Sequence, residues 1–167
     1  MDHFSFLETT AEISIAFAGF VSIFLVLARR DGSFSPDYAL TIRSTLMCSI
    51  SCLCFAAVPL ILAALGVSGA ALWRWPSAAL LLSISSISFY MFTNRRNLNA
   101  RQQGTVFARL AWSLAALAML TAVANVAGWP RSPNPGVYLM SLWLVLGISS
   151  VNFLDLVLRG VLGGARE

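Results

Sequence analysis

A few polar residues interrupt the long apolar stretches of this sequence, and they are the first candidates for chemistry. Four of them recur at helical spacing on one face of a helix predicted over residues 77–93 and its continuation: Ser83, Ser86, Tyr90 and Asn94. A continuous polar face on a membrane helix can line a water-filled path. The same groups can instead hold neighbouring helices together or bond back to their own helix. The sequence leaves both interpretations open.

One carboxylate, Glu12, lies just inside the first apolar stretch. At about 1.5 Å of rise per residue, it sits about 4–5 Å inside a helix that would begin near residue 9. There it can bind an ion or a proton at the mouth of a path, because charges inside membrane segments usually serve function. Alternatively, it is a first-turn acid stabilised by the positive end of the helix dipole.

A second carboxylate, Asp155, precedes Arg159 by one helical turn, and Asn152 lies a turn deeper. Acid before base at this spacing is the favourable order for a pair on one helix. We expect either a polar inner gate formed by Asn152 and Asp155, with Arg109 as a further candidate, or a neutralised pair that fixes the depth of the helix.

Enzyme, metal and cofactor chemistry is not expected. The three cysteines, Cys48, Cys52 and Cys54, all fall in one apolar stretch, where a free thiol behaves as a small hydrophobic group. His3 is the only histidine, so haem or zinc held by several histidines is disfavoured. The chain also contains no glycine-rich phosphate loop and no nucleophile-elbow motif.

The elements that must position these residues are membrane helices. The chain is 58% hydrophobic and only 11% charged, against about a quarter charged in soluble domains. Its apolar residues gather in five runs, each close to the ~20 residues that a helix needs to cross a bilayer. The runs cover residues 10–28, 43–65, 77–93, 110–128 and 137–158. The sequence therefore predicts an all-α bundle of five transmembrane helices, as one domain in contact with lipid and without a soluble domain.

Arginine placement predicts the orientation. All eleven basic residues are arginine. Nine of them fall on one side of a five-crossing topology, and only Arg74 and Arg131 fall on the other. The positive-inside rule then places the N-terminus outside and the C-terminus in the cytoplasm, in the plasma membrane and most simply a bacterial inner membrane. Since no basic stripe alternates with aromatic residues, the net charge of +4 does not indicate a nucleic-acid partner.

The helix ends carry further signals. Ser35-Pro36-Asp37 predicts that the second helix begins at this proline, ahead of its apolar run. We expect the segments Trp73–Pro76 and Trp129–Arg131 to lie in the two outer loops, because tryptophan favours the membrane interface.

Small residues mark the surfaces on which helices can approach closely. They form two rows, Ala16 and Gly19 in the first run and Ala111, Ala115, Ala118 and Ala122 in the fourth. These rows predict close packing, within the chain or between copies of it.

Two functions follow as hypotheses. The first is a small homo-oligomeric channel or transport protein for ions or small solutes. In that case the polar face of the third helix lines a path, with Glu12 and Asp155 near its mouths. The alternative is a non-transporting accessory, assembly or signalling protein that binds a larger membrane protein through its small-residue surfaces.

Overall fold

The computed structural model describes residues 3–28, 36–96, 106–129 and 132–163. Within these residues it is all-helical, with five helices, and each of them is long and apolar enough to cross a membrane. The helices are α1 (His3–Ala28), α2 (Pro36–Ala64), α3 (Ala70–Arg96), α4 (Val106–Ala127) and α5 (Pro135–Gly163). The shortest, α4, has 22 residues, or about 33 Å at 1.5 Å per residue, which exceeds a hydrocarbon core of about 30 Å. The prediction of five apolar helices is confirmed.

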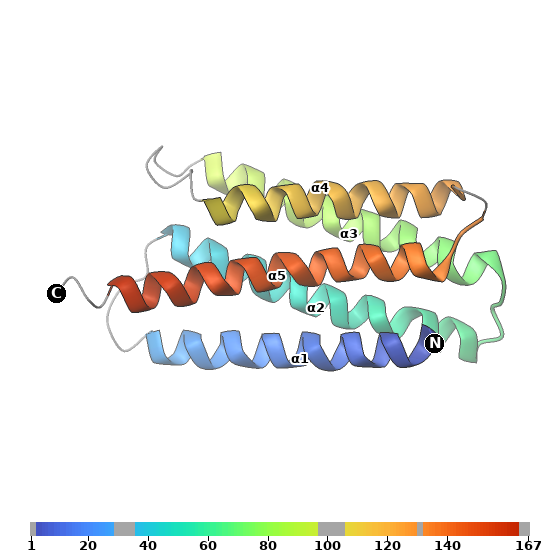
Figure 1. Cartoon of the computed structure of the whole chain (residues 1–167), viewed down its shortest axis with the longest axis horizontal. Helices are drawn as coiled ribbons and strands as arrows, with labels where there is room; N and C mark the ends of the chain where they lie inside the picture. Colours follow the sequence, from blue (N-terminus) through green and yellow to red (C-terminus); the bar gives the residue numbers. More distant parts are fainter. Residues whose placement is uncertain (1–2, 29–35, 97–105, 130–131, 164–167) are drawn as a thin grey trace.

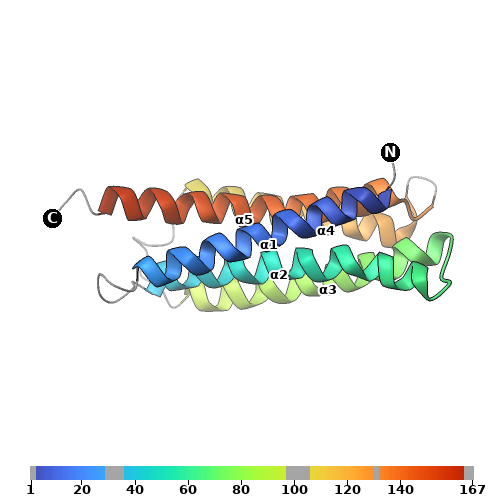
Figure 2. The same cartoon turned by 90° about the horizontal axis from the view of Figure 1, so that it is seen from below.

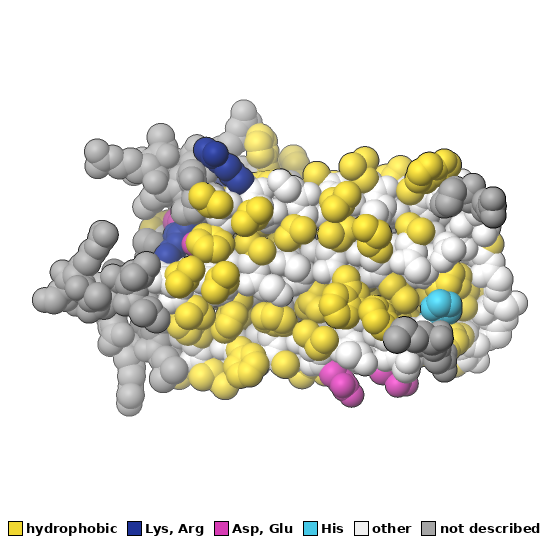
Figure 3. All heavy atoms as spheres, viewed as in Figure 1, with side chains coloured by type: hydrophobic (Ala, Val, Ile, Leu, Met, Phe, Trp, Pro, Cys, Tyr) yellow, Lys and Arg dark blue, Asp and Glu magenta, His cyan; other side chains and the backbone are white. Residues whose placement is uncertain are grey.

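The helices run side by side in alternating directions along one long axis, so the two ends of the chain lie at opposite ends of the bundle (Figure 1). We call the end at which α1, α3 and α5 finish the basic end, because Arg95, Arg109 and Arg159 lie near it. The other end is called the tryptophan end, after Trp73, Trp75 and Trp129. Figure 3 shows hydrophobic side chains over most of the visible face between the two ends.

Helix α5 is the central element. It contacts all four other helices, and half of its apolar span is buried, the largest share of the five. Helix α1 is the most peripheral. It contacts α2 and α5 and crosses the bundle obliquely (Figure 2). Only 17% of its span is buried, so most of its surface faces outward.

The helices extend beyond the predicted apolar runs. Helix α2 begins at Pro36, as the Ser-Pro-Asp signal predicts. Helix α3 begins at Ala70, so the prediction that Trp73–Pro76 lies in a loop is wrong. Pro76 lies in the second turn of α3, so the carbonyl of Leu72, four residues before it, has no helical N–H donor, and the helix nevertheless runs through it. Burial decides the outcome: Trp73 is 8% exposed and packs against Tyr138, with ring centroids 5.9 Å apart.

Helices α2 and α4 end in the same way at the tryptophan end. Gly66 follows α2 with a φ of 83°, and Gly128 follows α4 with a φ of 76°. The next backbone N–H in each case donates to the carbonyl five residues back, at 3.0 Å from Val67 and 2.9 Å from Trp129. This is the Schellman arrangement, which needs a residue in the left-handed region and so favours glycine.

The interior is closely packed through its middle. Three alanines of α4 turn inward, with Ala118 and Ala122 fully buried and Ala115 7% exposed. Hydroxyl groups join neighbouring helices at this depth, including Ser49 with Ser149 at 3.2 Å. In membrane proteins such contacts contribute about 0.6 kcal/mol each.

Candidate functional site

A group of ionised side chains lies buried at the basic end, between α2 and α5. Arg159 binds Asp155 with two parallel contacts, from Nε to Oδ1 at 2.9 Å and from Nη2 to Oδ2 at 2.8 Å. Its third nitrogen, Nη1, donates to Oδ2 of Asp37. The side chain of each acid is only 7% exposed, and that of Arg159 is 30% exposed. Paired contacts of this kind are among the stronger hydrogen bonds in proteins.

The order of the helices explains why these charges meet. Asp37 is in the first turn of α2, where the helix dipole favours an acid. Arg159 lies near the end of α5, just before its last turn. Because α2 begins at the end of the bundle where α5 finishes, and the two helices are in contact, Asp37 and Arg159 come next to each other.

Arg95, near the end of α3, completes this group. Asp37, Asp155 and Arg159 all lie close enough to act on its guanidinium electrostatically. We call Asp37, Arg95, Asp155 and Arg159 the charge cluster. Two acids and two arginines give the cluster a formal charge of zero, which is the composition that buried charges need.

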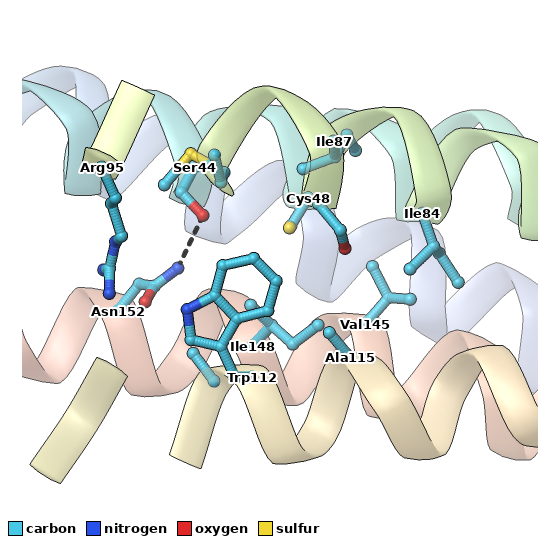
Figure 4. Close-up of a pocket in the computed structure, with 13 residues that line it drawn as sticks. Ser44, Cys48, Ile84, Ile87, Arg95, Trp112, Ala115, Val145, Ile148 and Asn152 are labelled. Carbon is cyan, nitrogen blue, oxygen red and sulfur yellow. Dashed lines mark hydrogen bonds between the residues drawn. The ribbon is translucent and has the colours of Figure 1, made fainter. Parts of the chain in front are cut away.

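A cavity lies directly beside the charge cluster, among α2, α3, α4 and α5. The centres of water molecules can occupy a volume of about 40 Å³ within it. Its polar end carries Arg95, Asn152 and Ser44, whereas Ile84 and Val145 line its apolar end. Figure 4 shows the guanidinium of Arg95 pointing toward the carboxamide of Asn152.

Two side chains shape the polar end of the cavity. Asn152 is 5% exposed, and its amide donates to Oγ of Ser44 at 3.0 Å, which joins α5 to α2. Trp112 of α4 lies in the middle of the cavity wall, and the nitrogen of its indole faces the end with Arg95 and Asn152 (Figure 4). The cavity therefore has its charged residue, together with Asn152, Ser44 and the indole N–H of Trp112, toward one end.

A separate polar group closes the tryptophan end. Asn125 of α4 donates to Oγ of Ser77 at 2.7 Å, and its Oδ1 accepts from the backbone N–H of Asn134 at 2.7 Å. This fully buried asparagine thus joins α3, α4 and the start of α5.

Pro59 lies inside α2 and changes the hydrogen bonding of the interior. A proline within a helix has no N–H for the carbonyl four residues before it, which here belongs to Phe55. The hydroxyl of Tyr138, from α5, donates to that carbonyl. Tyr138 is fully buried. Its hydroxyl therefore replaces the helical donor that Pro59 lacks.

The predicted polar face of α3 does not line this cavity. Ser83 forms a hydrogen bond with Ser51 of α2 at 3.2 Å, and Ser86 is exposed and bonds back to the carbonyl of Leu82 at 2.8 Å. Tyr90 accepts a hydrogen bond from Arg43 at 3.1 Å, and Asn94 donates to the carbonyl of Tyr90 at 2.8 Å. From α3, it is the neighbouring Ser88 that faces the cavity.

The other candidates separate into two groups. Asn152 and Asp155 lie together at the basic end, but Arg109 lies on the exposed side of α4, and the arginines that join them are Arg95 and Arg159. Glu12 is exposed in the first half of α1, the half nearer the tryptophan end.

The small residues fall into a group buried inside the bundle and a group exposed on α1. Ala115, Ala118 and Ala122 pack inside the bundle, and Ala111 is half-buried at the cavity wall. Ala16 and Gly19 are exposed on α1, and a Cβ added at Gly19 would meet nothing within 4 Å.

Sequence reasoning missed Asp37 and Arg95 as members of a site. In the sequence, Asp37 is only part of the Ser-Pro-Asp signal that begins the second helix, and Arg95 counts only toward the orientation. The signal available was an acid at the start of one apolar helix and bases at the ends of two others. Which of these residues meet depends on helix neighbours, which periodicity does not give.

Among the described residues, no group of three or more histidines, cysteines or acids is placed to hold a metal ion. The chemistry that the site offers is the breaking and re-forming of ion pairs next to a partly polar cavity. No protein-family model, curated protein or solved structure matches the chain.

Proposed function

We propose that this protein is a small homo-oligomeric membrane transport protein for ions or small solutes. The observation that carries the proposal is the charge cluster beside a cavity between the helices. Ionised residues inside membrane helices are rare, and they mark substrate paths and gates more often than they serve stability alone. The cluster is therefore interpreted as a gate at one end of a solute site.

The orientation follows from the basic end. We infer that this end faces the cytoplasm of a bacterial cell and that the N-terminus is outside, because nine of the eleven arginines belong to the same side. Trp75 and Trp129, which are 69% and 71% exposed, would then lie at the outer interface.

The gate works through the contact of Arg159 with Asp37. This contact joins α5 to α2, so the two helices separate at the basic end only when it breaks. The bidentate pair with Asp155 lies within α5 and keeps Arg159 neutralised while the contact is open. Toward the outside, the packed alanines of α4 and the Asn125 contacts with α3 and α5 form the opposing barrier.

Self-association is proposed through α1. Its outward face carries Ala16, Gly19 and Ser22, the kind of small side chains that let two membrane helices approach closely. Beside this face an apolar groove runs between α1 and α5, lined by Phe17, Phe153 and others, with about 550 Å³ of open space. We infer that α1 of a second copy occupies this groove.

Solute flux into liposomes tests the transport function. Purified protein should accelerate osmotic swelling after mixing with a permeant solute. The substitution Asp155→Asn, which weakens the hold on Arg159, should raise the passive rate by loosening the gate. Arg109→Gln changes one exposed charge at the same end and should leave the rate unchanged. No acceleration above empty liposomes for any of a panel of ions and small solutes would exclude transport.

Self-association needs a test of its own. Gly19→Ile places a bulky side chain on the proposed α1 contact and should shift the protein from an oligomer to a monomer in detergent or lipid. Val123→Ile adds a methyl group at an exposed position of α4 and should leave the oligomer intact. A native protein that is already monomeric would contradict the homo-oligomer.

An accessory role is the second candidate, and the surface of α1 favours it specifically. Glu8 and Glu12 are exposed on this helix, and acidic side chains lie along the α1 edge in Figure 3. A larger membrane protein with basic residues at that depth would fit this face. Absence of flux, together with co-purification of one such protein that Glu12→Gln weakens, would favour this role over transport.

A further inference from the structure

We propose that the cavity beside the charge cluster binds a short-chain monocarboxylate, with its carboxylate at Arg95 and its alkyl group among the apolar side chains. The biological role of this binding rests on the proposed transport function. Binding itself can be measured without transport.

The polar end of the cavity offers hydrogen-bond donors. Arg95 has five N–H groups in a planar fork, so it can interact with the neighbouring acids and still present donors to a ligand. The indole N–H of Trp112 faces the same end, and the hydroxyl of Ser88 lies in the cavity wall. The donors of Arg95 and Trp112 at this end favour a group that accepts hydrogen bonds, and a carboxylate accepts several.

The charges at this end select a single negative charge. A carboxylate on Arg95 gains charge-assisted hydrogen bonds, which are roughly twice as strong as those of a neutral amide. Asp37 and Asp155 also act electrostatically on Arg95, and their charges oppose a second negative charge on the ligand. A dianion such as a phosphate is therefore disfavoured. A cation is disfavoured as well, because Arg95 itself lines the cavity.

The size of the cavity and its apolar wall favour a ligand with a short alkyl group. The 40 Å³ open to water centres corresponds to about three water molecules, at about 10–15 Å³ each. A carboxylate and an alkyl group of two or three carbons fill such a space. The far wall is apolar, with Ile84, Ala115 and Val145, so it favours an alkyl group over a sugar or an amino acid.

Equilibrium binding of radiolabelled butyrate to the protein in lipid nanodiscs tests the proposal, with empty nanodiscs as the blank. We expect saturable binding of the labelled butyrate, and unlabelled butyrate should compete with it. Butyramide, which has the same shape without the charge, should compete at least tenfold less well. Octanoate distinguishes a lipid-derived chain from a free short acid. Weaker competition by octanoate than by butyrate supports a site that fits only a short chain. Competition by octanoate as strong as by butyrate would overturn the size argument.

Two pairs of variants locate the site. Ala115→Leu fills the apolar end and should abolish binding, whereas Ala116→Leu, the same change on the exposed side of α4, should not. Arg95→Gln should weaken binding at least tenfold, and Arg109→Gln should leave it unchanged. Because Arg95→Gln also disturbs the charge cluster, Ala115→Leu decides the question if that variant fails to fold.

The outcomes separate this proposal from the transport function. Binding without flux would overturn transport and leave the site standing. Flux of other solutes without butyrate binding would overturn the site and leave transport standing. Butyrate binding that survives Ala115→Leu in a folded protein would place the ligand elsewhere and refute the assignment.

Discussion

The hydroxyl of Tyr138 should contribute to stability because Pro59, inside α2, leaves a buried carbonyl without its helical donor. The carbonyl of Phe55 has lost its helical donor to Pro59, and Tyr138 supplies the replacement from α5. The substitution Tyr138→Phe removes that donor and keeps the ring. An unsatisfied buried carbonyl costs about 1–3 kcal/mol, and hydrogen bonds between membrane helices reach about 1.7 kcal/mol. We expect Tyr138→Phe to lower the free energy of unfolding by about 1.5 kcal/mol, within that range.

The double variant tests whether the Tyr138 hydroxyl replaces the donor that Pro59 lacks. In a Pro59→Ala background, residue 59 regains an N–H that can donate to Phe55 within the helix. Tyr138→Phe should then cost less than about 0.5 kcal/mol, because the carbonyl stays satisfied. The coupling energy between the two sites should therefore be about 1 kcal/mol.

Reversible unfolding by titration of sodium dodecyl sulfate into mild-detergent micelles measures these four free energies. Tyr90→Phe is the matched control, since its hydroxyl only accepts a bond from the exposed Arg43, and it should change stability by less than about 0.5 kcal/mol. If Tyr138→Phe is equally destabilising with proline or alanine at position 59, the hydroxyl is not replacing a missing helical donor, and this account of the contact fails.

Three further substitutions probe the ends and the middle of the bundle by the same unfolding measurement. Asp37→Asn leaves Arg159 and Arg95 with one acid in place of two and should cost about 3–5 kcal/mol, as breaking a buried ion pair does; a loss below 1 kcal/mol would show that the cluster is solvated. Asn125→Ala removes the contacts to Ser77 and Asn134 and should cost about 1–3 kcal/mol. Ala118→Leu should cost about 1–3 kcal/mol by overpacking a fully buried position, while Ala116→Leu should be nearly neutral; equal effects would contradict the close packing of α4.

The number and type of the helices follow from the sequence because apolar run length is a local property. The ends are harder to predict. A hydropathy run reports where the chain is apolar, and α3 continues past it through Trp73–Pro76 because Trp73 is buried against Tyr138. That contact joins residues far apart in the chain, so no local pattern contains it.

The candidate site shows the same limit. The pair of Asp155 and Arg159 was predictable, because one helix holds both residues a turn apart. The place of Asp37 was not, since it depends on α2 lying against α5. For α3, periodicity groups Ser83 and Ser86 correctly on one face, but it does not say which neighbour that face meets. The cavity instead meets the next face around the helix, at Ser88.

The contact between Asp37 and Arg159 also bears on how the protein is made. It joins the start of the second helix to the last helix, so it cannot form until α5 has been synthesised and has reached its neighbours. Until then Asp37 and Arg95 lack the other two members of the charge cluster, Asp155 and Arg159, which both belong to α5. Packing of α5 against α2 therefore completes the neutral cluster. A chain halted before α5 would lack this contact and would keep Asp37 and Arg95 without their α5 partners at the basic end.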